Sequence, residues 1–194
     1  MKRLIRKAFG QLLYHGTTLE NLQSITDSGM IMPQETDGAG LDVQNKQSAK
    51  DRAFNRLYDE GLRPDTEEYD LKYESYFEEE YEKELKKING YTFFTDSMVL
   101  AKDYSNSSPI VVLEVSLPED SLLPDDNDCD DCVEWAESLQ RIGQVKVPGT
   151  ITDDYIVGVH IFKDRDDEGQ FFPKLEWVNQ YVRDEELQKA SKRK

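Results

Sequence analysis

Apolar and polar positions divide the chain into three parts. Residues 11–33 begin with a short apolar run, which is followed by apolar positions at helical spacing and a glycine stop at Gly29. Residues 34–89 form a long polar segment, and the part after it is rich in strand-like apolar runs. Residues 110–115 are apolar apart from Glu114, as in a buried strand, and residues 155–162 alternate. The pattern predicts a strand and a helix, an insertion, and a second half that supplies the sheet.

The polar segment 34–89 is predicted to be a helical insertion. We expect a helix around Ala49 to Tyr58, a break at Pro64 and an acidic helix from about Glu67 to Ile88. Aromatic side chains recur at helical spacing in the second helix, at Tyr69, Tyr73, Tyr76, Phe77 and Tyr81. Such a stripe serves either core packing or recognition of another molecule.

Length and composition favour one compact domain. The chain has 194 residues, and a hydrophobic content of 37% can fill a core even though 33% of the residues are charged. We therefore expect a single domain over residues 1–194, with the insertion at about 34–89 and a charged C-terminal tail at about 183–194.

The net charge of the chain limits which classes of molecule it is expected to bind. The chain carries 40 acidic and 24 basic residues, for a net charge of −16. A surface this negative repels phosphate backbones, which disfavours a nucleic-acid target and favours protein or small-molecule partners. The basic residues 1–9 are not followed by an apolar core of secretory length, and no window approaches a transmembrane span. We expect a cytoplasmic protein.

Two patterns that resemble metal sites are incomplete. Cys129 and Cys132 form a lone Cys-x-x-Cys, and without a second pair or a nearby histidine we expect two ordinary thiols. The alternating aspartates of residues 126–130, with Glu137 at the twelfth place, imitate a calcium-binding loop. The sixth place, however, is Asp131, where the sharp turn needs a glycine. No metal is expected.

Two short motifs carry the candidate chemistry. His15-Gly16-Thr17 follows the first apolar run, and the aromatic run of residues 90–96 precedes a helical stretch that ends at Tyr104. Glycine lets a ligand amide approach the backbone closely, while the histidine ring and the threonine hydroxyl can bond sugar hydroxyls. Tyr104 and an aromatic from residues 91–94 could sandwich a flat, positively charged ring, as in a nicotinamide riboside.

In these motifs the chain resembles the ADP-ribosyltransferases of the diphtheria-toxin and poly(ADP-ribose) polymerase branch, whose triad is His-Tyr-Glu. The matching parts are the His-Gly-Thr at the end of a strand, the aromatic turn Phe93 to Asp96, and a stacking tyrosine, Tyr104, eight positions after Asp96. The resemblance implies an α+β fold of two packed antiparallel sheets with helices around an NAD cleft. It also implies that His15 and Gly16 hold the ribose and the carboxamide, that Thr17 lies beside them, and that Tyr104, Phe93 and Phe94 line the nicotinamide.

Two triad positions depart from the family. Phe93 stands where the family usually has the triad tyrosine, and the residue that precedes the Val147-Pro148-Gly149 turn at the glutamate position is Gln144. Gln144 can bond a ribose hydroxyl but brings no negative charge. Asp154 is the second candidate for the third catalytic group, and Glu137 is a distant third.

The resemblance leaves three functions open. The first is an NAD-dependent mono-ADP-ribosyltransferase, with NAD as substrate and a protein as the acceptor. The second is a catalytically silent module that binds NAD or ADP-ribose, which the loss of the carboxylate would allow. The third is an NAD glycohydrolase, which uses water as the acceptor.

Overall fold

A computed structural model describes residues 10–33, 43–64, 66–105, 108–173 and 178. The predicted charged tail at 183–194 and the basic residues 1–9 lie outside these ranges. The chain divides into two compact units, one formed by Met1–Pro33 with Thr92–Lys194 and the other by Gln34–Tyr91. No helix of the described residues is long and apolar enough to cross a membrane.

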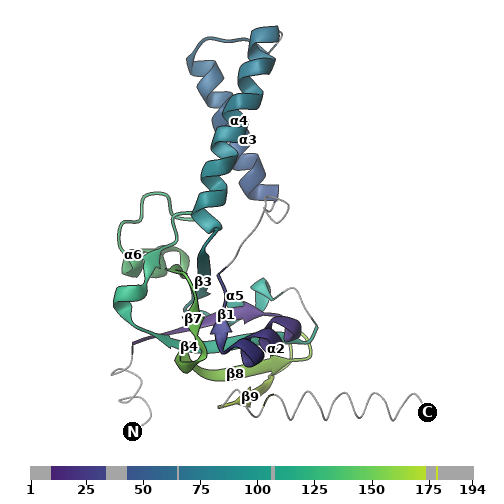
Figure 1. Cartoon of the computed structure of the whole chain (residues 1–194), viewed down its shortest axis with the longest axis vertical. Coiled ribbons are helices and arrows are strands. Elements are labelled where there is room, and N and C mark those ends of the chain that lie inside the picture. The colour runs from purple at the N-terminus through teal and green to yellow at the C-terminus, as the bar shows by residue number, and fades with distance from the viewer. Residues whose placement is uncertain (1–9, 34–42, 65, 106–107, 174–177, 179–194) are drawn as a thin grey trace, which may run out of the picture. The chain divides into compact units, whose positions relative to one another are not determined.

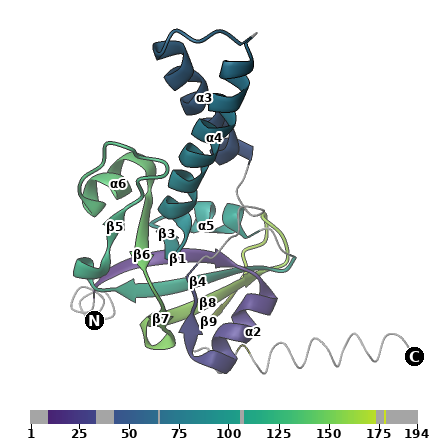
Figure 2. The same cartoon turned by 45° about the horizontal axis from the view of Figure 1, so that its top comes forward.

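Within the described residues, the strands of the first unit form a seven-stranded sheet and a two-stranded sheet (Figures 1 and 2). The large sheet has the order β5-β6-β3-β1-β4-β8-β9, and its registered pairs are antiparallel. Its strands are β1 (Gln11–Thr17), β3 (Tyr91–Thr95), β4 (Ile110–Leu117), β5 (Leu123–Pro124), β6 (Gln144–Pro148), β8 (Ile156–Phe162) and β9 (Gln170–Phe172). The small sheet pairs β2 (Met30–Ile31) with β7 (Ile151–Thr152). Antiparallel strands with interspersed helices confirm the α+β class.

The helices of this unit begin and end where local chemistry dictates. They are α2 (Leu19–Ser28), α5 (Met98–Tyr104) and α6 (Trp135–Ile142), with short 3₁₀ turns η1 (Glu119–Ser121) and η2 (Asp153–Tyr155). The side chain of Thr18 caps α2 by accepting from the backbone N–H of Asn21. Gly29 ends the helix in the left-handed region at φ 70°, which confirms the predicted stop.

Strand β4 lies inside the large sheet, paired with β1 on one side and β8 on the other. All eight of its residues are buried, which confirms the predicted buried strand. On one face, a large core combines β4 with side chains of β1, β3 and α2, among them Leu13, Phe94 and Leu22. On the other face, α5 covers β4 and buries Val112 with Ala101. Because side chains alternate along a strand, neighbouring residues of β1 also face opposite sides.

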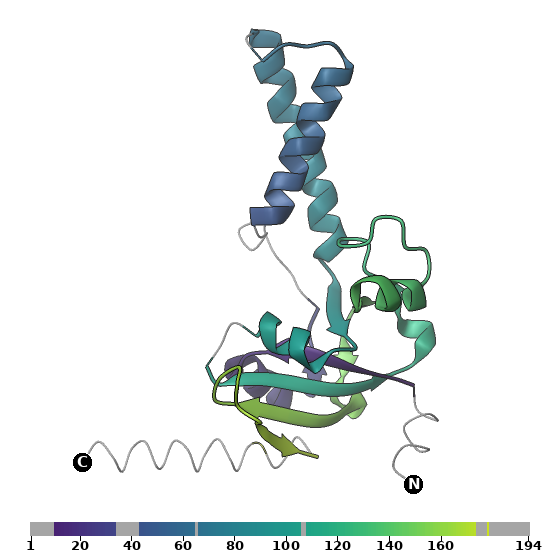
Figure 3. The ribbon, with the colours of Figure 1, turned by 180° about the vertical axis from the view of Figure 1, so that it is seen from behind.

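The second unit is a pair of helices, α3 (Val43–Asp59) and α4 (Glu67–Ile88), which contact each other along their length (Figure 3). They confirm the predicted helices, and α3 starts earlier than expected. Three small or apolar residues of α3 are fully buried, Ala49, Ala53 and Leu57. Buried carboxylates of α4 pair with arginines of α3, Glu84 with Arg52 and Glu80 with Arg56.

The aromatic stripe of α4 forms a ladder. Tyr69, Tyr73, Phe77 and Tyr81 stack in sequence, with ring centroids 5.6–6.3 Å apart. All four side chains are half-buried. Tyr76 lies off this row and takes the guanidinium of Arg56 at 4.0 Å above its ring. The stripe therefore contributes to packing of the helix.

Candidate functional site

The predicted site residues of the sheet come from three neighbouring strands. His15 lies on β1, Phe93 and Phe94 lie on β3, and Gln144 opens β6, and the sheet order places β3 between β1 and β6 (Figure 2). Tyr104 is the last residue of α5, which packs on β1 and β4. The fold thus collects five residues from distant parts of the sequence around one part of the sheet.

The His15 ring is fixed by a backbone bond. Its Nδ1 lies 2.9 Å from the carbonyl oxygen of Phe93. Because a carbonyl only accepts, Nδ1 carries the proton, and in the neutral ring Nε2 is left as an acceptor. Burial lowers the pKa of His15 below its ordinary value of 6.5, although the bond to Phe93 works in the opposite direction. At neutral pH His15 is therefore a neutral ring that offers a lone pair.

Phe93 and Phe94 face opposite sides of β3 and serve different purposes. Phe94 is only 2% exposed and belongs to the large core, and its ring lies 5.4 Å from the His15 ring. The Phe94 side chain therefore packs beside His15 in the core, and its expected place at the nicotinamide stays a prediction. Phe93 is half-buried and stays a candidate for the clamp.

Strands β1 and β3 pair over a short distance. In their backbone register, Tyr14 is paired with Thr95. One residue farther along β1, the two strands are linked by the bond from the His15 side chain to the Phe93 carbonyl oxygen. On its other side β1 pairs with β4 over its full length, from Gln11 to Thr17. The edge of β1 that faces β3 is therefore held by a side chain at the point where His15 and Gly16 lie.

The close packing of α5 on β1 leaves room for only a glycine at residue 16. A Cβ at this position would lie 2.0 Å from the carbonyl oxygen of Ala101 and 3.0 Å from the backbone nitrogen of Ser105. The Ser105 hydroxyl donates to the carbonyl oxygen of Thr17 at 2.6 Å, and Thr17 is itself buried. Sequence reasoning assigned Gly16 to a close approach by a ligand, whereas in the structure the close approach at its Cα comes from α5.

Tyr104 and Gln144 meet, although they are far apart in the sequence. The Gln144 side-chain amide lies close enough to the Tyr104 hydroxyl to lower its pKa, while 53% of the Tyr104 residue is exposed. Burial raises the pKa of Tyr104, and the nearby Asp128 and Asp125 carboxylates raise it further. The hydroxyl is therefore protonated at neutral pH, and the exposed ring is available for stacking.

The junction between α6 and β6 positions Gln144. Gly143 ends α6 in the left-handed region at φ 72°, and its carbonyl oxygen accepts from the backbone N–H of Asp96 at 3.3 Å. This bond joins the start of β6 to the turn after β3. Gln144 is consequently held beside the aromatic turn, as the resemblance implies.

The two other candidates for the third group lie apart from Gln144. Asp154 is exposed in η2, which follows β7 beyond the Pro148 end of β6. Gln144 stands at the opposite end of that strand. Glu137 lies in the first turn of α6, where it accepts from the Arg141 side chain at 3.3 Å. Of the three candidates, Gln144 is the one whose side chain lowers the pKa of Tyr104.

Sequence reasoning missed three residues that surround Gln144. Ser138 donates its hydroxyl to the Gln144 carbonyl oxygen at 2.7 Å and accepts from the backbone N–H of Asp125 at 3.0 Å. Asp128 accepts from the Gln144 side-chain Nε2 at 3.5 Å. Asp125 is 1% exposed, and burial raises its pKa to about 6. The signal was the run of aspartates, which we had compared with a calcium-binding loop.

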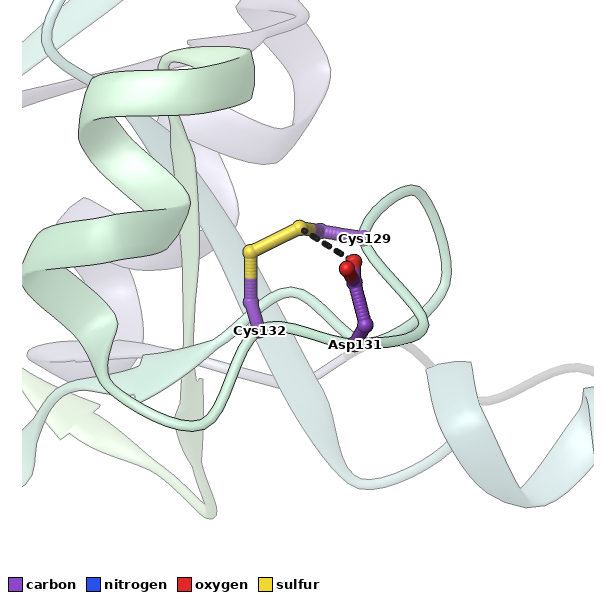
Figure 4. Close-up of side chains that lie close together, drawn as sticks. All are labelled: Cys129, Asp131 and Cys132. Atoms are coloured by element: carbon purple, nitrogen blue, oxygen red, sulfur yellow. Dashed lines mark hydrogen bonds between the residues drawn. A yellow bond between two sulfur atoms is a disulfide. The ribbon is translucent and has the colours of Figure 1, made fainter.

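The two cysteines correct another expectation. Cys129 and Cys132 form a disulfide, where we expected two thiols (Figure 4). The physical reason is a tight turn, in which the Cys132 backbone N–H donates to the Cys129 carbonyl oxygen at 3.1 Å and the two Cα atoms lie 5.4 Å apart. This separation is typical of disulfides.

The same pair belongs to a cluster that could be mistaken for a metal site. Among the described residues, Cys129, Asp131 and Cys132 are the one group of three potential ligands within 4.8 Å of one another. The paired sulfurs are not thiolates, and the 3.7 Å approach of Asp131 to Cys129 in Figure 4 is a contact, since a disulfide sulfur has no proton to donate. Asp131 is instead paired with Arg141 at 2.9 Å.

Neither the scan against protein-family models nor the search of curated proteins gave a match for this sequence.

Proposed function

We propose that this protein is an NAD-dependent mono-ADP-ribosyltransferase with the ADP-ribosyltransferase fold and a degenerate triad. The closeness of the Gln144 side chain to the Tyr104 hydroxyl is the observation that carries the proposal. These residues match the stacking tyrosine and the catalytic glutamate of that family, and the fold joins them although no local pattern requires it. The His15 ring on the next strand but one matches the third conserved element of the site.

The ligand would lie along the edge of β1. His15 and the Cα of Gly16 face opposite sides of the strand, because Gly16 is covered by α5 and His15 contacts Phe94. Tyr104 belongs to the α5 side. A dinucleotide that meets both groups must therefore pass the edge where the pairing of β1 with β3 is short.

In the proposed reaction the bond between nicotinamide and the ribose breaks, and its electron pair leaves with the nicotinamide. Tyr104 and Phe93 stack the nicotinamide, and the backbone of Gly16 holds its carboxamide. The Nε2 lone pair of His15 accepts a hydrogen bond from a ribose hydroxyl. Gln144 orients the ribose while positive charge develops on its anomeric carbon. A nucleophile of the acceptor then attacks that carbon. We propose a protein acceptor, because the net charge of −16 on this chain repels nucleic acids.

The test is incubation with NAD, with nicotinamide release and transfer of labelled ADP-ribose to lysate proteins as readouts. We expect the wild type to release nicotinamide slowly. Gln144→Glu should raise the rate, because it adds the missing charge, and Asp154→Asn should change it little. If Asp154→Asn abolishes turnover, Asp154 is the working carboxylate. The loss would then be on the order of 3 kcal/mol of transition-state stabilisation.

The absence of a carboxylate at residue 144 favours one second candidate, a silent module that binds NAD or ADP-ribose. The same incubation separates the candidates. Labelled protein identifies a transferase, free ADP-ribose identifies an NAD glycohydrolase, and binding with neither product identifies the silent module. A protein that neither binds NAD nor releases nicotinamide would contradict the proposal altogether.

A further inference from the structure

The loop before α6 is fastened to the strand that carries Gln144. Ser138 links the loop to Gln144 through its bonds to the Asp125 backbone and to the Gln144 carbonyl oxygen. Two residues along β6, the buried Lys146 pairs with Asp126. The Ser138 hydroxyl, bonded to the Gln144 backbone, and the Lys146 side chain thus fasten the start of the loop, at Asp125 and Asp126, to β6.

Bonds inside the loop aim Asp128 at Gln144. The Asp125 side chain accepts from the backbone N–H of Asn127 at 3.1 Å, and the Asp125 carbonyl oxygen accepts from the backbone N–H of Cys129 at 3.0 Å. Asn127 donates its side-chain amide to one Asp128 oxygen at 3.3 Å. The other Asp128 oxygen, Oδ2, lies 3.5 Å from Nε2 of Gln144.

A carboxylate in this position changes what the amide can do. An amide that donates to a carboxylate is held in one orientation, and its oxygen becomes a better acceptor because neighbouring hydrogen bonds polarise one another. The Gln144 side chain would also be the one group between the negative charge of Asp128 and the ribose. Charge at that distance still favours a positive centre where the effective dielectric constant is lower than that of water.

We propose that Asp128, acting through the Gln144 amide, supplies the negative charge that the family's glutamate would supply directly. Asp128 is then a positioning residue and Gln144 is the group that touches the ribose. The inference rests on the proposed function, and it explains how NAD cleavage is retained without a carboxylate at residue 144.

The test compares kcat and KM for NAD cleavage in the full-length wild type and in three variants. Asp128→Asn should lower kcat on the order of tenfold while KM stays within about twofold, because the lost charge acts as the bond opens. Asp131→Asn removes an equal charge from the same loop. Because Asp131 pairs with Arg141 and not with Gln144, this variant should leave both constants unchanged. In the double variant Gln144→Glu/Asp128→Asn the carboxylate is moved to residue 144, and kcat should recover to at least the wild-type value.

The double variant should also cleave NAD faster than Gln144→Glu alone. In the single variant two carboxylates would share the 3.5 Å contact and oppose each other's ionisation. Melting temperatures check that all variants fold, and we expect little change for Asp128→Asn because the side chain is exposed. If the wild type cleaves NAD and Asp128→Asn cleaves it equally fast, the inference fails and the proposed function stands. If the wild type does not cleave NAD, both fail.

Discussion

Tyr104 is the residue with the clearest consequence for binding, because its exposed ring and its hydroxyl, which lies near Gln144, can be separated by mutation. Tyr104→Ala removes the stack and should weaken NAD or nicotinamide binding by about 1 kcal/mol or more, measured by calorimetry. Tyr104→Phe keeps the ring and should bind close to wild type. Equal affinity for the alanine variant would remove Tyr104 from the site.

Asp125 makes stability depend on pH. Its ordinary pKa of 3.8 is raised to about 6, mainly by burial, so the folded state holds its proton more tightly than the unfolded state. Above pH 6 both states are ionised and folding bears the cost of a buried charge. Stability contributed by Asp125 is therefore full below about pH 4 and is lost as the pH rises to about 6.

Asp125→Asn should remove this loss. The asparagine oxygen can still accept from Asn127, and no charge is buried. We expect the variant to gain on the order of 1–3 kcal/mol over the wild type at pH 7.5 and nothing at pH 4, in denaturant unfolding at both values. A gain of equal size at both values would show that ionisation of Asp125 is not the cause.

At the residue scale, the two motifs predicted His15, Gly16, Tyr104 and an aromatic of residues 91–94 as neighbours, and the resemblance added Gln144. The fold brings Tyr104 to Gln144 and His15 to Phe93. Spacing could not predict Asp128, because its place depends on Ser138 and Lys146, which anchor the loop through contacts distant in sequence. Nor could it predict which of two adjacent aromatics belongs to the core, because the two face opposite sides of a strand, and here Phe94 is the buried one.

At the scale of elements, the pair α3 and α4 is held by buried charges as well as by apolar packing. Glu84 has a side chain that is 2% exposed, paired with Arg52 and with Lys87 at 3.7 Å. Arg52→Ala should destabilise the helix pair by about 2–4 kcal/mol, because a buried carboxylate loses a main partner. Hydrogen exchange of the α3 and α4 amides measures this loss.

Lys72→Ala is the matched control for this prediction. Lys72 pairs with Glu60 and Glu68 on the surface, where ion pairs contribute about 0–1 kcal/mol. Its exchange rates should stay close to wild type. Similar acceleration in both variants would show that burial of Glu84 is unimportant.

Most helices and main strands could be predicted because each follows from its own segment, but the helix α6 was not expected. Helical spacing and the Thr18 cap define α2, and the Pro64 break separates α3 from α4. The disulfide could not, since two cysteines three positions apart close only when the intervening turn brings them together. The short strands β2, β5 and β7 were also missed, because two residues carry no period.

At the scale of the whole molecule, the proposed NAD site and its loop belong to one unit, Met1–Pro33 with Thr92–Lys194. Replacing residues 34–89 by a flexible linker of about 12 residues should therefore leave nicotinamide release within about threefold of wild type. Circular dichroism should show the loss of α3 and α4. A folded variant without activity would mean that the helix pair contributes to the reaction.

The most direct measurement is a structure of the full chain with a non-hydrolysable NAD analogue bound. The account predicts the nicotinamide ring stacked on Tyr104, its carboxamide at the backbone of Gly16, and ribose hydroxyls at His15 Nε2 and Gln144. Asp128 should remain on the far side of the Gln144 amide. A ligand bound elsewhere, or a ribose held by Asp154 with Gln144 turned away, would contradict the account.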